Sequence, residues 1–246
     1  MRWLEGTSPQ LAAAAGGVAI LPLGALEAHG PHLPVGTDVW IAGAMARAGA
    51  ARLAAAGIPA FVLPPLAFAP APFAAGFPGT LSIRPETLTA LVVDLGQALA
   101  EGGVAVLALA NAHFDPAQVG ALREAVRRIS ERGRPRVAFP DLTRRALAAR
   151  LTEEFRSGAC HAGRYETSIL LAERPDLVDE AVRAGLPELQ VSLIDLARGG
   201  AATFREAGLE AAYCGAPAAA SSAEGRETVA RLGDLLAEAV QAVWPA

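Results

Sequence analysis

The strongest constraint on the fold is an alternation of two kinds of segment along the chain. Short apolar runs bounded by glycine or proline are typical of buried strands, and longer segments with apolar residues at helical spacing are typical of helices. The expected strands are residues 17–23, 58–63, 104–110 and 136–139, and the expected helices are residues 38–56, 84–101, 116–132 and 141–155. This order predicts an α/β fold with a mostly parallel sheet, right-handed crossovers and helices on both faces.

Length and charge narrow the class of protein. The chain has 246 residues, of which 52% are hydrophobic, enough for the core of one domain spanning residues 1–246. The net charge is −4, and no run of like charges occurs. This pattern gives no electrostatic basis for binding nucleic acid or an anionic membrane surface, so we expect a small or peptide-like substrate.

The cysteines and the N-terminal region indicate a cytoplasmic setting. Cys160 and Cys214 are far apart and lack metal-ligand spacing, so they form no disulfide framework. An apolar run at residues 11–26 could be taken for a secretory signal. It contains Gly16, Gly17 and Pro22, is too short to span a bilayer, and leads directly into a polar cluster, so we reject that interpretation.

The histidines are unusually concentrated. The chain contains no lysine, one asparagine and four histidines. All four histidines lie in three short clusters that also carry carboxylates, at residues 27–38, 111–115 and 161–168. Scattered surface histidines would not show this pattern, so the clusters are candidates for chemistry.

The first two clusters each follow an expected strand. Ligands of open parallel sheets bind beyond the carboxyl ends of the strands, and carboxylate with imidazole is a donor set suited to zinc, manganese or iron. The candidates are Glu27, His29 and Asp38 in the first cluster, and His113 and Asp115 in the second. Two alternatives stay open, because Asp38 and Asp115 each also stand where an N-cap would start the following helix.

The third cluster holds His161 and Glu166, with Glu166 in the first turn of an expected helix. A single histidine is more often structural than catalytic. Because every histidine of the chain belongs to these clusters, we favour proton transfer for His161, a role suited to an imidazole whose pKa lies near neutrality.

The motifs resemble those of the creatininase (creatinine amidohydrolase) family. Residues 21–38 follow the family's opening motif of glutamate, any residue, histidine-glycine, then histidine-leucine-proline and threonine-aspartate. Residues 77–81 resemble its phenylalanine-proline-glycine-threonine turn, residues 161–168 resemble its third motif, and residues 215–217 with Gly225 resemble a late glycine-rich stretch.

The resemblance implies a three-layer α/β/α fold, a site for two divalent ions, commonly zinc or manganese, and a homohexamer. By motif position, Glu27 and His113 would hold one ion, and His29 and Asp115 the other. Asp38 would bridge the two ions.

The function implied is hydrolysis of a carbon–nitrogen bond outside ordinary peptides, in a cyclic amide or amidine. A metal-bridging hydroxide would be the nucleophile and His161 the proton shuttle, while Glu166 would orient the site or touch a metal. Phe114-Asp115 is closer to the creatinine-cleaving type of the family than to its other members, with a shorter acid. The apolar segment 68–73 replaces polar residues that often precede the turn at residue 77, which argues against creatinine itself. The alternatives are a branch that trims a precursor peptide in mycofactocin-type redox-cofactor maturation, or a non-catalytic binding protein.

Overall fold

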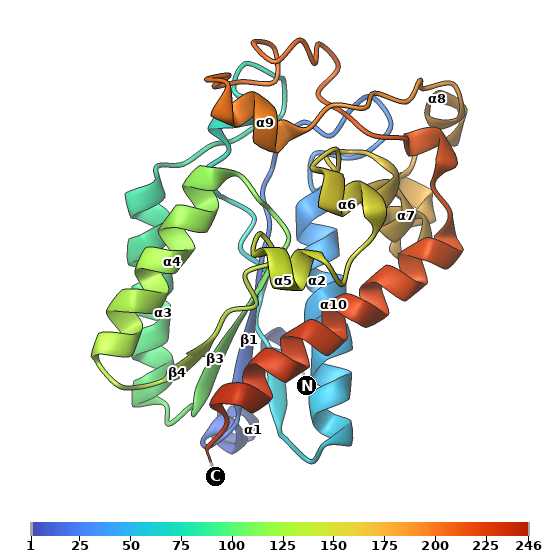
Figure 1. Ribbon diagram of the computed structural model, residues 1–246. Helices are drawn as coiled ribbons and strands as arrows, with labels where there is room; N and C mark the ends of the chain where they lie inside the picture. Colours follow the sequence, from blue (N-terminus) through green and yellow to red (C-terminus); the bar gives the residue numbers. More distant parts are fainter. Residues whose placement is uncertain (1, 246) are drawn as a thin grey trace.

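A four-stranded parallel sheet forms the centre of the molecule (Figure 1). The computed structural model describes residues 2–245. The strands are β1 (Val18–Leu23), β2 (Ala60–Val62), β3 (Val106–Asn111) and β4 (Arg136–Ala138), in the order β2-β1-β3-β4. All three neighbouring pairs are parallel, and Val18 lies opposite both Ala60 and Val106. The parallel sheet predicted from the sequence is confirmed.

Long helices cover both faces of this sheet, which confirms the three-layer α/β/α fold. One layer holds α3 (Pro85–Glu101) and α4 (Pro116–Glu131). The opposite layer holds α2 (Thr37–Ala55), α7 (Arg164–Glu173) and α10 (Ser222–Val243).

The alternation of side chains along the two central strands supplies both halves of the core. The side chains that face α2, α7 and α10 are Val18, Ile20, Val106, Ala108 and Ala110. The side chains that face α3 and α4 are Ala19, Leu21, Leu23, Leu107 and Leu109. Both strands are buried on both faces, and each fully buried Leu, Ile or Val contributes roughly 1.5–3 kcal/mol. The sheet is therefore a rigid base for the loops at its carboxyl end.

Glycines allow α10 to pack closely on its neighbours. A Cβ on Gly225 would collide with the backbone carbonyl of Ser168 in α7, and a Cβ on Gly233 would lie 2.6 Å from the Cβ of Ala48 in α2. The late glycine singled out in the sequence is thus a contact point between helices.

The remaining elements are short. They are the helices α1 (Ser8–Leu11), α5 (Arg145–Ala148), α6 (Glu153–Ser157), α8 (Glu180–Ala184) and α9 (Leu193–Arg198), with 3₁₀ turns at Trp3–Glu5, Ala12–Ala14, Pro72–Ala74, Pro175–Leu177 and Pro217–Ala219. The helix predicted over residues 141–155 is wrong, because the segment forms only α5 and the start of α6. Thr152 explains the break: its side chain accepts the Phe155 N–H and caps a new helix.

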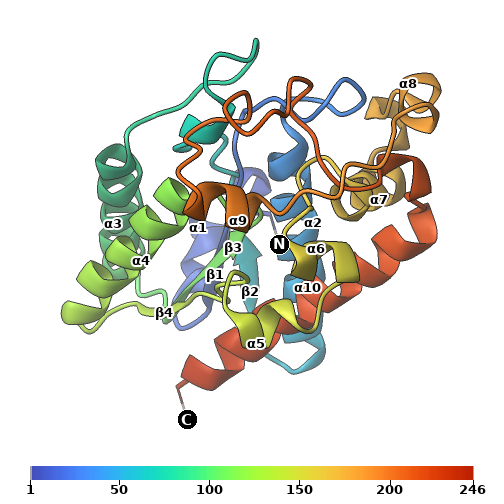
Figure 2. The same ribbon diagram turned by 45° about the horizontal axis from the view of Figure 1, so that its top comes forward.

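The loops after β1 and β3 meet at one end of the sheet, and the segment that carries α9 lies over that end (Figures 1 and 2). Within residues 2–245, no helix combines the length and the apolar character needed to cross a membrane.

Candidate metal centre

Four of the predicted ligands come together beyond the carboxyl ends of β1 and β3. Glu27 and His29 lie in the loop after β1, Asp38 is in the first turn of α2, and His113 follows β3. Their exposed fractions are between 1% and 3%. Polar side chains this deeply buried require polar or metal partners, and these four side chains converge so that they can share them.

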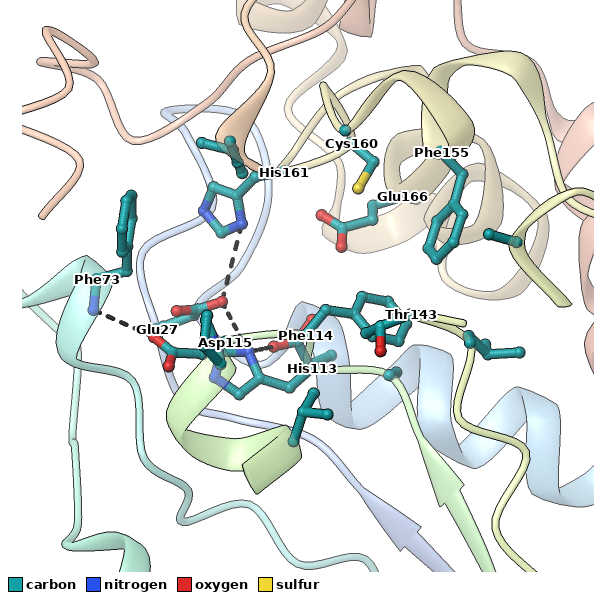
Figure 3. A pocket seen from close by; sticks show the side chains of 18 of the residues that line it. Glu27, Phe73, His113, Phe114, Asp115, Thr143, Phe155, Cys160, His161 and Glu166 are labelled. Atoms are coloured by element: carbon teal, nitrogen blue, oxygen red, sulfur yellow. Dashed lines mark hydrogen bonds and ion pairs between the residues drawn. The ribbon is translucent and has the colours of Figure 1, made fainter. Parts of the chain in front are cut away.

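Asp38 stands between the two histidines (its oxygens face different rings). Its Oδ1 lies 3.3 Å from His29 Nε2, and its Oδ2 lies 3.0 Å from His113 Nδ1. Glu27 Oε1 lies 3.1 Å from the same His113 nitrogen, as Figure 3 shows. One carboxylate thus serves two adjacent groups of donors, as a bridging ligand would.

Hydrogen bonds to backbone carbonyls orient both histidine rings. His29 Nδ1 donates to the Glu27 carbonyl at 3.0 Å, and His113 Nε2 donates to the Pro70 carbonyl at 2.9 Å. The remaining nitrogen of each ring faces the carboxylates. Metal-binding histidines are commonly held in this way, with one nitrogen fixed by an outer partner and the other free to coordinate.

Glu166 completes the second group of donors from a distant part of the chain. It lies in the first turn of α7, and its Oε2 is 3.6 Å from His29 Nε2. The same oxygen accepts the Ala162 N–H at 2.7 Å. Ala162 has a φ of 49°, a left-handed conformation that places the turn next to the carboxylate. His29, Asp38 and Glu166 therefore form one possible ligand set, and Glu27, Asp38 and His113 form another.

Asp115 lies beside the site, but both of its oxygens accept backbone hydrogen bonds. Oδ1 accepts from the Ala117 N–H at 2.7 Å, which caps α4, and Oδ2 accepts from the Phe73 N–H at 3.3 Å (Figure 3). Within residues 2–245, Asp115 belongs to none of the convergent donor groups. The cap considered from the sequence is present, and it leaves less freedom for a metal.

His161 faces the donors from the opposite wall (Figure 3). Its Nε2 donates to the Ala28 carbonyl at 2.9 Å, and its Nδ1 lies 3.8 Å from Glu27 Oε1. The ring stacks on Phe204, with centroids 4.3 Å apart. These contacts fix the ring so that a nitrogen lone pair faces the centre.

The charges of the site are strongly coupled. Burial opposes protonation of His29, but the carboxylates of Asp38, Glu166 and Glu27 outweigh burial and raise its pKa to about 10. Burial likewise opposes ionisation of Asp38, but His29 and His113 outweigh it and hold the pKa of Asp38 well below its usual range. Without a metal, the site therefore holds protons between imidazole and carboxylate.

Two further groups have displaced pKa values. Burial raises the pKa of Glu166 to about 8, and the charges of Asp38 and Glu27 act in the same direction. Burial, assisted by the charge of His29, lowers the pKa of His161 to about 4. At neutral pH His161 is thus a neutral imidazole, able to accept a proton.

The donors fit divalent ions. His29 Nε2 is buried and has no hydrogen-bond partner among the described residues, although three carboxylates surround it. A ring nitrogen left in that position is suited to coordination. Imidazole and carboxylate together match zinc, manganese or iron.

Four of the donors, Glu27, Asp38, His113 and Glu166, form the buried floor of a cavity of about 620 Å³. Its side walls are largely apolar and aromatic, and include Phe73, Phe114, Leu142, Phe155 and Phe204. Cys160 also lines the cavity, and burial raises the pKa of its thiol well above the usual range. The thiol is therefore uncharged and inert as a nucleophile.

The sequence did not indicate two of these contributors. Phe204 stacks on His161 from the segment after α9, where no motif marks it. His32 received no metal role from the sequence. Its Nε2 forms a hydrogen bond of 2.9 Å with the Thr167 hydroxyl and so connects the first motif to α7. The histidine-leucine-proline part of the motif was the only signal for that link.

A family model described as "Creatininase: Creatinine amidohydrolase" matches residues 5–240. The chain belongs to the creatininase family. It is 36% identical over 238 residues to a mycofactocin precursor peptide peptidase of Mycobacterium tuberculosis, covering 94% of this chain and 84% of that protein. It is 32% identical over 172 residues to a creatinine amidohydrolase of Pseudomonas putida, covering 66% of each.

Solved structures of the family agree with the fold. A structure titled "Creatininase Mn" superposes with a TM-score of 0.71 at 27% identity, covering 100% of this chain and 99% of that one. The resemblance seen in the motifs is thus confirmed at the level of family and architecture, and the protein is a creatininase-family hydrolase by homology.

Proposed function

We propose that the chain is a metal-dependent amidohydrolase that cleaves an amide carbon–nitrogen bond in a peptide-like substrate. The observation that carries the proposal is the convergence of five buried donors, four of which line one large cavity. The donors are Glu27, His29, Asp38, His113 and Glu166.

The proposed ligand sets follow the contacts. Glu27, His113 and one oxygen of Asp38 would hold one divalent ion, zinc or manganese, and His29, Glu166 and the other oxygen of Asp38 would hold a second. This assignment replaces Asp115 with Glu166. When bound, two such metal ions lower the pKa of a shared water and polarise the carbonyl group of the substrate that the water attacks.

His161 is the proposed proton carrier. Its Nε2 proton is engaged by the Ala28 carbonyl, so its Nδ1 lone pair is the one that faces the site. A neutral ring there accepts a proton from the attacking water and returns it to the leaving nitrogen. A positioned acid–base group of this kind typically accelerates a reaction by a factor of about 10² to 10⁴.

The cavity favours a peptide-like substrate over a small ring. Its volume of about 620 Å³ lies within the range of pockets that enclose drug-sized ligands, roughly 300–1,000 Å³. Phe114 and Phe155 contact each other edge to face, with centroids 5.2 Å apart, and provide an apolar wall for a side chain. The relative that shares 36% identity is named as a peptide peptidase. Hydrolysis of a cyclic amide is the second candidate, favoured by the relative named creatinine amidohydrolase.

A cleavage screen tests the proposal. Protein stripped by a chelator is reloaded with Mn²⁺ or Zn²⁺ and incubated with N-acetylated di- to tetrapeptides bearing apolar side chains, and with creatinine as the ring-amide arm. Mass spectrometry detects the new amine. We expect peptide cleavage by the reloaded protein only, and loss of cleavage in His161→Ala. Cleavage of the ring amide alone would support the second candidate, and no cleavage at full metal occupancy would support a binding protein.

We also propose that the chain forms a homo-oligomer, and the family resemblance implies a hexamer. The apolar side chains of Val35, Phe68 and Leu81 are exposed, and Val35 contacts Gly79 close to Leu81. Assembly would remove such side chains from water. Light scattering on the purified protein tests this, and a monomer at micromolar concentration would contradict it.

A further inference from the structure

The carboxylates and the arginines that line the cavity lie in different parts of it. All lining carboxylates lie at the floor, next to the metal centre, and are Glu27, Asp38, Asp115 and Glu166. The lining cations are Arg123, Arg156 and Arg198. Arg123 is two turns along α4 from Asp115, which is about 12 Å at the rise of an α-helix. All three arginines are exposed, whereas the four carboxylates are buried, so the arginines form the outer wall, although the whole chain carries a net charge of −4.

Arg123 already has a counter-ion. Its Nε and Nη2 donate to Asp141 Oδ2 at 2.9 and 2.6 Å, and Nη2 also donates to the Thr143 hydroxyl at 3.1 Å. Asp141 is buried, so this pair is a fixed part of the wall. Arg123 has little capacity left for a ligand.

Arg156 and Arg198 are different. The guanidinium of Arg156 has no hydrogen-bond or ion-pair partner within residues 2–245. Among the residues that the structure describes, the only ion-pair partner of Arg198 is Asp195, at 3.5 Å, and the two side chains are 77% and 74% exposed. An exposed ion pair at that distance contributes little to the stability of the protein, so it hardly restrains the Arg198 side chain. Both guanidinium groups remain available to an anion.

The two helices that carry these arginines are joined at the cavity. The N–H of Leu193, the first residue of α9, donates to the carbonyl of Gly158, just after α6, at 3.0 Å. Figures 1 and 2 show α9 at the end of the molecule where the loops after β1 and β3 lie. The same cavity is also lined by the apolar side chains of Phe155 and Leu142.

We propose that Arg156 and Arg198 bind a carboxylate of the substrate, so that the full substrate has a scissile amide, an apolar part and an acidic end. This inference rests on the proposed function, because it specifies the substrate of the same site. Guanidinium groups bind carboxylates through two parallel hydrogen bonds, and a carboxylate is the anion that peptide-like molecules carry. It is supplied either by the C-terminus or by an Asp or Glu side chain.

Binding to metal-stripped protein tests the proposal separately from catalysis. Matched peptides differ only at the C-terminus, free acid against carboxamide, or only at one side chain, Glu against Gln. Isothermal titration calorimetry compares the wild type with Arg156→Gln, Arg198→Gln and the double variant. Arg226→Gln is the control, because that arginine is exposed on α10 and does not line the cavity.

In the wild type, one of the two acidic peptides should bind about tenfold more tightly than its neutral match, the scale of one partly exposed charge-assisted hydrogen bond. The arm that shows the preference identifies the source of the carboxylate. The double variant should lose the preference while binding the neutral peptide unchanged, and Arg226→Gln should keep it. Equal affinity for acidic and neutral peptides in the wild type, a preference retained in the double variant, or no binding of any peptide at millimolar concentration would overturn the proposal.

The same peptides keep the two proposals distinguishable. A carboxylate preference in a protein that cleaves no peptide after metal loading would retain the binding site and refute the amidohydrolase. Peptide cleavage without any carboxylate preference would support the amidohydrolase and refute the carboxylate-binding site.

Discussion

Asp115 and Glu166 compete for the fifth ligand position, and one pair of substitutions separates them. Asparagine caps helices about as well as aspartate, so Asp115→Asn should preserve the hydrogen bond from Ala117 and leave the metal content at two ions per chain. Glu166→Gln should keep an oxygen for the Ala162 N–H, because an amide oxygen also accepts, yet lose the ion shared with His29. A neutral amide is a poorer ligand than a carboxylate.

The stability cost of removing Asp115 follows from its two hydrogen bonds. Asp115→Ala leaves the N–H groups of Ala117 and Phe73 without their acceptor. Loss of an N-cap costs about 1 kcal/mol, and loss of the second hydrogen bond, which is long at 3.3 Å, adds about 0.5–1 kcal/mol. For a chain of this size 1 kcal/mol corresponds to roughly 2–4 °C in Tm. The metal-free Asp115→Ala protein should therefore melt about 3–8 °C below the wild type, while Asp115→Asn should melt close to it.

Two measurements check this prediction. Plasma mass spectrometry after dialysis against a weak chelator counts the ions, and calorimetry of the metal-free variants gives Tm. If Asp115→Asn lost one ion at an unchanged Tm while Glu166→Gln kept both ions, the ligand set proposed here would be wrong. The assignment implied by motif position, with Asp115 as ligand, would then replace it.

Three further predictions follow from the same contacts. Asp38→Ala should lose both ions, because its two oxygens face different histidines, and plasma mass spectrometry tests this against the wild type. His161→Ala should keep both ions yet turn over substrate about a hundredfold more slowly; loss of metal in parallel with activity would make His161 a ligand. Because the folded-state pKa of His29 is raised to about 10, its contribution to metal-free stability is fully present below the unfolded pKa of about 6.5 and is lost as pH rises through about 10. Metal affinity should rise over the same pH window, because binding a metal releases the proton of His29. Calorimetry in buffers of different ionisation enthalpy measures the protons released. A metal affinity independent of pH would contradict the protonated state of His29.

The layers of the fold were predictable because β1 and β3 are buried on both faces. Their apolar runs have no polar alternation, which is the signature of central parallel strands. The outer strands were predicted too long: residues 58–63 yield only Ala60–Val62, and residues 136–139 yield only Arg136–Ala138. An apolar run indicates burial, whereas a strand also requires hydrogen bonds to a neighbouring strand. β2 and β4 are at the edges of the sheet and each have one neighbouring strand, so their paired segments are shorter than their apolar runs.

The candidate site was predictable to the extent that its donors follow strands. The sequence places Glu27, His29 and His113 after β1 and β3, and parallel topology brings such loops together. Glu166 depends on tertiary structure, because it reaches His29 from α7, more than a hundred residues away. The choice between Asp115 and Glu166 could not be made locally, since an Asp-Pro pair starts a helix whether or not a metal is near.

The deciding contact for Asp115 comes from another segment. The Phe73 N–H occupies the oxygen that capping left free, and Phe73 belongs to the long connection after β2 that also holds the Pro70 carbonyl against His113. The connection after β2 therefore orients His113 through one backbone group and occupies an oxygen of Asp115 through another. Connections this long within compact domains are commonly functional, and the sequence indicated the length but not the contacts.

Charge balance links the buried donors to the proposed chemistry. Three carboxylates, those of Glu27, Asp38 and Glu166, are buried around two imidazoles. In the metal-free protein, protons on His29 and His113 offset part of that charge, which is why the pKa values of both rings are raised. Two divalent ions in place of those protons would leave one excess positive charge facing the cavity. The charge of a hydroxide formed from the shared water would balance it and would pass to the substrate carbonyl as the oxyanion develops, so the site would stabilise that oxygen more strongly than the uncharged carbonyl of the bound amide.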